Sequence, residues 1–77
     1  MAKYRITTFR GYSYKSSYDT ALQEAKDMIM DIIVDRHPIK RWWAVISYES
    51  DNEHVATVHC PAIGQWNIIK AFKDLQQ

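Results

Sequence analysis

The 77-residue sequence is poor in residues that impose covalent or local constraints: it has one cysteine, two glycines and two prolines. With Cys60 alone no internal disulfide can form, which fits a reducing compartment. Ten basic residues nearly balance nine acidic ones, and a net charge of +1 gives no whole-molecule attraction to nucleic acids or membranes. The sequence contains no apolar run long enough to cross a bilayer and does not open with a signal peptide. We therefore expect a cytoplasmic protein that does not enter a membrane.

Motifs that carry chemistry are also scarce. Gly11 and Gly64 are isolated, so the sequence contains neither a glycine-rich phosphate-binding loop nor a nucleophile elbow. It has no CxxC or HExxH spacing that would indicate a metal site. His59 and Cys60 are neighbours, and on a strand they would point to opposite faces and could not act as a nucleophile–base pair. We expect no enzyme activity, no cofactor and no metal ion.

The remaining composition is that of an ordinary globular domain. Hydrophobic residues make up 47% of the chain and charged residues 25%, which argues against disorder. A chain of this length suffices for one hydrophobic core, so we expect residues 1–77 to form a single domain. Because so small a core gives marginal stability, a homodimer is one candidate state.

The first half of the sequence predicts a strand, a loop and a helix. Residues 3–9 alternate as in a strand, and residues 10–18 are polar and rich in tyrosine, which predicts a loop. A helix is predicted over residues 20–35, started either by a capping box of Ser16 with Asp19 or by Asp19 as the cap, and followed by Pro38. Its apolar face, at helical spacing, consists of Ala21, Leu22, Ala25, Met28, Ile29, Ile32 and Ile33.

Two β-rich segments, 42–48 and 54–60, predict a hairpin closed by the three-residue loop Ser50-Asp51-Asn52. Asparagine tolerates the left-handed backbone conformation that ends such a loop. Since neighbouring side chains on a strand point to opposite faces, only one of the two adjacent tryptophans can enter the core. The register places on the core face Trp42, Ala44, Ile46, Ala56, Val58 and Cys60. The opposite, mixed face carries Trp43, Val45, Ser47, Val55, Thr57 and His59.

After Pro61, which should stop the third strand, a short final helix is predicted from about residue 65. Its inward positions would be Trp66, Ile68, Ile69, Phe72 and Leu75. The predicted fold is α+β, with the order β-α-β-β-α and a three-stranded sheet that packs two helices on one face. The first helix would cross over between two strands that are parallel if they are neighbours.

This predicted order and length resemble those of a DNA-damage-inducible regulator that binds a recombinase filament. The final helix of that family is strongly acidic, whereas here Lys70 and Lys73 outnumber Asp74. Small chains without catalytic motifs are also common among phage-encoded inhibitors of host defence, including anti-CRISPR proteins. Both likenesses concern architecture and size, and neither assigns a role to a residue.

One candidate surface combines basic and aromatic side chains around the outward tryptophan. Tryptophan, tyrosine and arginine are the residues that dominate protein–protein interfaces, so a protein partner is the preferred interpretation. Basic residues interleaved with aromatics on a sheet also suit base stacking and phosphate contact, which makes RNA or DNA the alternative partner. The candidate residues are Arg5, Arg10, Tyr12, Tyr14, Lys40, Arg41, Trp43 and His59.

A second candidate surface is acidic. Glu24, Asp27, Asp31 and Asp35 lie three and four residues apart and form one stripe on the predicted helix. Such a stripe is ordinarily the solvated face of an amphipathic helix. It could alternatively mimic nucleic-acid phosphates, because residues four apart on a helix rise by about 6 Å.

Taken together, these patterns favour a non-catalytic module that acts by contact with another protein. An inhibitor or adaptor from a phage or mobile element is the concrete form that we expect. The strand edges of the sheet could also pair with another chain, including a second copy of this one. The alternative is a small RNA- or DNA-binding domain that uses the basic and aromatic sheet face.

Overall fold

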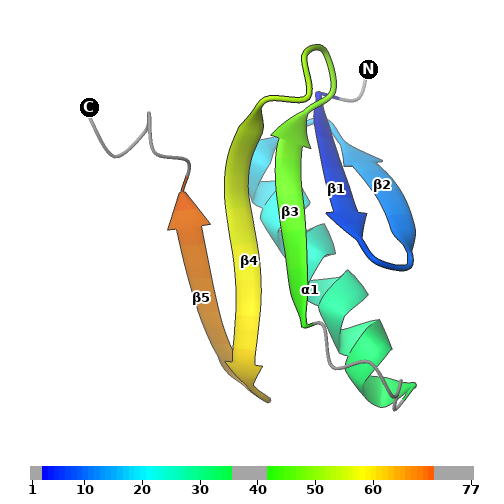
Figure 1. The fold of residues 1–77 in the computed structure, drawn as a ribbon, viewed down its shortest axis with the longest axis vertical. Coiled ribbons are helices and arrows are strands. Elements are labelled where there is room, and N and C mark those ends of the chain that lie inside the picture. The colour runs from blue at the N-terminus through cyan, green and yellow to red at the C-terminus, as the bar shows by residue number, and fades with distance from the viewer. Residues whose placement is uncertain (1–2, 36–41, 71–77) are drawn as a thin grey trace.

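In the described part of the chain, a single antiparallel sheet of five strands with one helix across one of its faces makes up the fold (Figure 1). The computed structural model describes residues 3–35 and 42–70. The strands lie in the spatial order β2-β1-β3-β4-β5, so the helix connects β2, at one edge, to β3 in the centre. The elements are β1 (Tyr4–Thr8), β2 (Gly11–Lys15), α1 (Tyr18–Val34), β3 (Trp43–Tyr48), β4 (His54–Ala62) and β5 (Gln65–Lys70).

The predicted three-stranded sheet with two helices is therefore wrong, and one reason lies in residues 11–15. This stretch, predicted as a loop, is strand β2, which pairs with β1 from Tyr4↔Lys15 to Thr8↔Gly11. Its tyrosines alternate with polar residues, which is a strand pattern. The extra strand reverses the chain once more before the helix, so β1 and β3 are antiparallel neighbours rather than parallel ones.

The second reason lies at the other end of the sheet. Residues 65–70, predicted to start a helix, form strand β5 and pair with β4. Pro61 does not stop β4: it sits where the β4–β5 register shifts between His59 and Ala62, a place where a missing N–H costs no regular ladder bond. Gly64, with φ of 87°, then provides the left-handed turn into β5. The resemblance to the recombinase-binding regulator rested on the order β-α-β-β-α, and because the observed order differs, the resemblance does not hold.

Two positions of the predicted final helix, Phe72 and Leu75, lie outside the described residues, as do Lys73 and Asp74. Among the described ones, Trp66 packs on the edge of the core, while Ile68 and Ile69 are 41% and 57% exposed. These apolar residues are spaced as in a helix, but they do not form the buried face of one.

The helix over residues 20–35 is confirmed to within two residues. Its cap is Ser17, whose hydroxyl oxygen accepts a hydrogen bond from the backbone N–H of Thr20, and not Ser16 or Asp19. Asp35 closes the other end by donating its backbone N–H to the carbonyl of Asp31. The buried helix residues are Ala21, Ala25, Ile29 and Ile32, all from the predicted apolar face.

The hairpin register is confirmed along most of its length. Ala44 lies opposite Val58 and Ile46 opposite Ala56, and these side chains are fully buried together with Cys60. A bulge next to Ile46 shifts the last pair to Ser47↔His54. The turn is one residue longer than predicted, because the N–H of Tyr48 donates to the carbonyl of Glu53, while Asn52 has the expected positive φ of 59°. The core lies between this hairpin, β1 and α1.

Candidate functional site

The sheet has one covered face and one open face. The helix α1 packs on β1 to β4 from one side, and no described element covers the other side (Figure 1). Strand pairing places on this open face Arg5, Thr7, Tyr12, Tyr14, Trp43, Val45, Ser47, His54, Thr57, His59, Asn67 and Ile69. No carboxylate occurs among these strand residues, which are all neutral or basic.

Trp43 lies on the open face, as the hairpin register predicts. Its side chain is 48% exposed, whereas Trp42 is half-buried and packs against the core. Trp43 pairs directly with His59 across β3 and β4, and their ring centroids are 6.2 Å apart in a tilted arrangement. The imidazole therefore supports one side of an indole whose other side is open to a partner.

Arg5 forms the second group of the open face, with the two tyrosines of β2. Its guanidinium carbon lies 5.8 Å from the ring centroid of Tyr12 and 5.9 Å from that of Tyr14, within the range of cation–π attraction. The same guanidinium donates a hydrogen bond to the side-chain oxygen of Asn52, in the β3–β4 turn. Arg5 Nε is buried without a hydrogen-bond partner among the described residues. Strand β2 and the β3–β4 turn thus fix the direction of the Arg5 side chain.

A row of side chains crosses all five strands between these two groups. The pairings join Tyr12, Thr7, Val45, Thr57 and Ile69 in that order. Tyr12 and Ile69, at the two ends of the row, are 67% and 57% exposed. The row gives the open face a continuous apolar and hydroxyl-bearing centre, with Arg5 at one end of the strands and Trp43 at the other.

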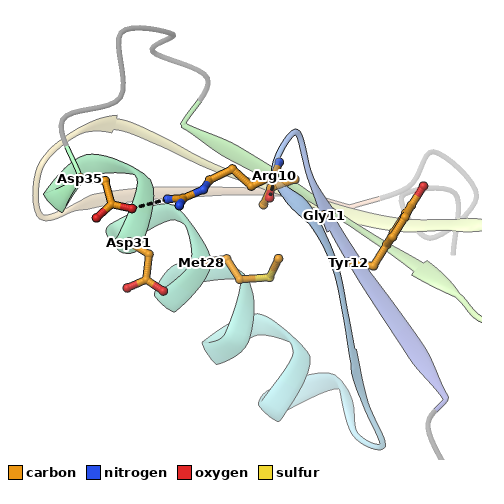
Figure 2. A pocket seen from close by; sticks show the side chains of 7 residues that line it. Arg10, Gly11, Tyr12, Met28, Asp31 and Asp35 are labelled. Atoms are coloured by element: carbon orange, nitrogen blue, oxygen red, sulfur yellow. Dashed lines mark hydrogen bonds and ion pairs between the residues drawn. The ribbon is translucent and has the colours of Figure 1, made fainter.

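Arg10 does not join this surface. It lies in the β1–β2 turn and forms an ion pair with Asp35 at the end of the helix. The pair borders a cleft of about 260 Å³, which is lined by Thr8, Arg10, Gly11, Tyr12, Met28, Asp31 and Asp35. Figure 2 shows Arg10 reaching across this cleft to Asp35, while the ring of Tyr12 points away from the helix.

The acidic stripe on α1 holds the helix to the first hairpin. Glu24 accepts a hydrogen bond from the hydroxyl of Ser13 at 2.9 Å and lies 3.4 Å from the ammonium of Lys15. Asp35 pairs with Arg10. The carboxylate of Asp27 accepts a hydrogen bond from Gln23 on its own helix, at 3.0 Å. Half of the stripe is therefore engaged in contacts with the sheet, which leaves little of it for mimicry of a phosphate backbone.

Two of the candidate residues, Lys40 and Arg41, lie outside the described residues. Several open-face residues were absent from the predicted site, and Asn52, which contacts Arg5 from the β3–β4 turn, was assigned only a turn role. The absent strand residues are Thr7, Val45, Ser47, His54, Thr57, Asn67 and Ile69. The predicted hairpin register already placed Val45 on the outward face, so the alternation of the strand indicated its position. For Ile69 the spacing of the apolar residues favours a helix, although the alternation of Trp66, Asn67 and Ile68 is also a short strand pattern.

Comparison with protein-family models, with curated proteins and with solved structures finds no match to this chain. In the described residues no group of three or more histidine, cysteine, aspartate or glutamate side chains is placed to hold a metal ion. The single described helix is not long and apolar enough to cross a membrane.

Proposed function

We propose that this chain is a non-catalytic binding module that recognises a protein partner through the open face of its sheet. The observation that carries the proposal is the exposure of Trp43 beside His59 on a face that no described element covers. Burying an indole that is half in water would contribute a large apolar area to a complex. Tryptophan, tyrosine and arginine are also the residue types that most often dominate binding energy at protein interfaces.

The arrangement around Arg5 supports the same function. A surface arginine ordinarily loses rotamer freedom when it binds, and that loss weakens the complex. Here the rings of Tyr12 and Tyr14 and the amide of Asn52 already restrict the guanidinium. A partner that presents a carboxylate or a carbonyl to Arg5 would therefore meet a donor held in place.

The composition of the open face indicates the chemistry of the partner. Its strand residues include no carboxylate, while Arg5 carries a positive charge. A complementary protein surface would combine acidic groups, facing Arg5, with an apolar pocket for Trp43. We assign such a module the role of an inhibitor or adaptor in the cytoplasm, of the kind that phages and mobile elements encode.

Capture experiments on the full chain test this function. Immobilised wild-type protein should retain a specific protein from host extract, and Trp43→Ala and Arg5→Ala should each lose it while remaining folded. Val34→Ala is the matched control, because Val34 is 70% exposed but lies on the helix. If the two open-face variants capture the same partner as the wild type, the open face is not the binding surface.

Nucleic-acid binding is the competing outcome of the same experiment. Aromatic rings and an arginine on an open sheet also suit single-stranded RNA or DNA. Titration with oligonucleotides should leave the tryptophan fluorescence unchanged if the partner is a protein. Quenching that weakens steeply with added salt would instead assign the open face to nucleic acid, because phosphate contacts release counterions.

A further inference from the structure

Strand β5 ends the sheet, and the backbone hydrogen bonds show which of its groups face outward. The N–H of Cys60 donates to the carbonyl of Trp42 at 2.9 Å, so Cys60 directs its backbone toward β3. Successive residues of a strand direct these groups to alternate sides, and His59 and Thr57 therefore face β5. The residues of β5 that pair with His59 and Thr57 are Asn67 and Ile69. It follows that Trp66, Ile68 and Lys70 direct their N–H and C=O groups away from the sheet.

The two edges of the sheet differ in how they are protected. The side chains of β2, at one edge, are tied to the helix, since Ser13 and Lys15 both contact Glu24. The stretch from Gln65 to Ile69 of β5 contains no charged residue and no proline, the devices that ordinarily keep edge strands apart. In the described chain no other element covers the outer side of β5 (Figure 1). The edge of β5 is thus open to another strand.

The apolar side chains of β5 are also partly exposed to solvent. Ile68 points to the helix side of the sheet, as its partner Val58 does, yet it is 41% exposed because the helix packs on β1 to β4. Trp66 lies on the same side, with the ammonium of Lys26 from the helix 5.9 Å from its ring centroid. An additional strand beside β5 would cover Ile68 at the place where the helix ends its cover.

We propose that β5 pairs antiparallel with β5 of a second copy of this chain, so that two five-stranded sheets join into one. A two-fold axis midway between the two Ile68 residues makes the edge self-complementary, because it places Ile68 opposite Ile68 and Trp66 opposite Lys70 of the second copy. All of these positions direct their backbone groups outward, and each pair would exchange two hydrogen bonds. The Lys70 ammonium would lie beside an indole rather than beside another cation. This dimer leaves both open faces on one side of the joined sheet, free for the proposed partner.

The mass of the full-length protein in solution, measured by sedimentation equilibrium over a range of concentrations, tests the proposal. The wild type should show a monomer–dimer equilibrium. Ile68→Pro removes the outward N–H without touching the ladder to β4, and should weaken dimerisation about tenfold or more. Ile68→Lys keeps the N–H but places two ammonium groups at the two-fold axis, and should also yield monomers. Thermal unfolding verifies that each variant is folded. If Ile68→Pro does not fold, the result for Ile68→Lys decides the test.

Trp43→Ala provides the control, since Trp43 lies on the open face and should leave the dimer intact. A wild-type protein that stays monomeric up to about 1 mM would overturn the proposal. It would equally be overturned by a dimer that persists in both Ile68 variants, or by one that Trp43→Ala alone dissolves. These outcomes are independent of the capture experiment, so the two proposals can fail separately.

Discussion

Arg5 and Tyr14 stand directly opposite each other on β1 and β2, and the guanidinium carbon lies 5.9 Å from the tyrosine ring centroid. Tyr12, two residues before Tyr14 and on the same face of β2, has its ring centroid 5.8 Å from the same guanidinium carbon. The first hairpin therefore shapes the open face of the sheet, because strand β2 contributes no residue to the buried core and its two tyrosines hold the guanidinium in place.

The contact between Arg5 and Tyr14 should be measurable as a coupling energy. A double-mutant cycle with Arg5→Ala and Tyr14→Ala should give about 0.5–1 kcal/mol, the range of an exposed cation–π pair, in chemical unfolding. Arg5→Lys should lose part of it, because an ammonium cannot stack a planar group on the ring. Strictly additive effects of the two single substitutions would show that the pair does not restrict Arg5.

The start of the helix offers a test with a built-in control. Ser17→Ala removes the hydroxyl that caps Thr20 and should lower the free energy of unfolding by about 1 kcal/mol. Ser16→Ala, one residue earlier, should change it by less than about 0.5 kcal/mol, the usual effect of a surface substitution. Urea unfolding of both variants measures the difference, and equal losses would contradict the assignment of Ser17 as the cap.

Stability and binding should separate at two residues of β3. Ile46 is fully buried, and Ile46→Ala should destabilise the fold by about 2–5 kcal/mol. Trp43→Ala, three residues away on the opposite face, should cost far less stability, because its side chain is 48% exposed. Thermal and urea unfolding give both values. A loss at Trp43 as large as that at Ile46 would mean that the indole serves the core rather than a partner.

The two ion pairs between the helix and the first hairpin should differ in strength. Arg10 and Asp35 are 44% and 52% exposed, so Asp35→Asn should cost at most about 1 kcal/mol, and the loss should shrink as salt is added. Glu24 is 23% exposed and accepts from Ser13 as well as pairing with Lys15. Glu24→Ala should therefore cost more, about 1–2 kcal/mol, with a weaker dependence on salt. Unfolding in low and high salt distinguishes the two, and the reverse ranking would contradict this account of the stripe.

The elements that the sequence predicted well are those whose pattern is long and set by burial. The helix carries its apolar residues over more than three turns, and the central hairpin alternates so cleanly that Ala44↔Val58 and Ile46↔Ala56 follow from the pattern. The outward position of Trp43 beside His59 followed from the same alternation. These features depend on which side chains are buried and which are in water, and the alternation of apolar and polar residues along the sequence shows this directly.

The two edge strands could not be predicted with the same means. Each is short and depends on hydrogen bonds to a neighbouring strand, a non-local interaction that leaves only a weak trace in a five- or six-residue pattern. In β5 the spacing of Trp66 and Ile69 also fits a helix, and the sheet overrides it. The pairing of Arg10 with Asp35 was equally hidden, because the direction of a turn side chain depends on the strand that follows it.

The central claim, that the open face binds a protein, is tested most directly by hydroxyl-radical footprinting of the captured complex. Oxidation rates of Trp43, Tyr12 and Tyr14 would be compared between the free chain and the complex, with Met30 on the helix as the internal reference. The account predicts that the complex protects all three aromatic rings while the rate at Met30 stays the same. Unchanged oxidation of Trp43 and both tyrosines in a stable complex would contradict it.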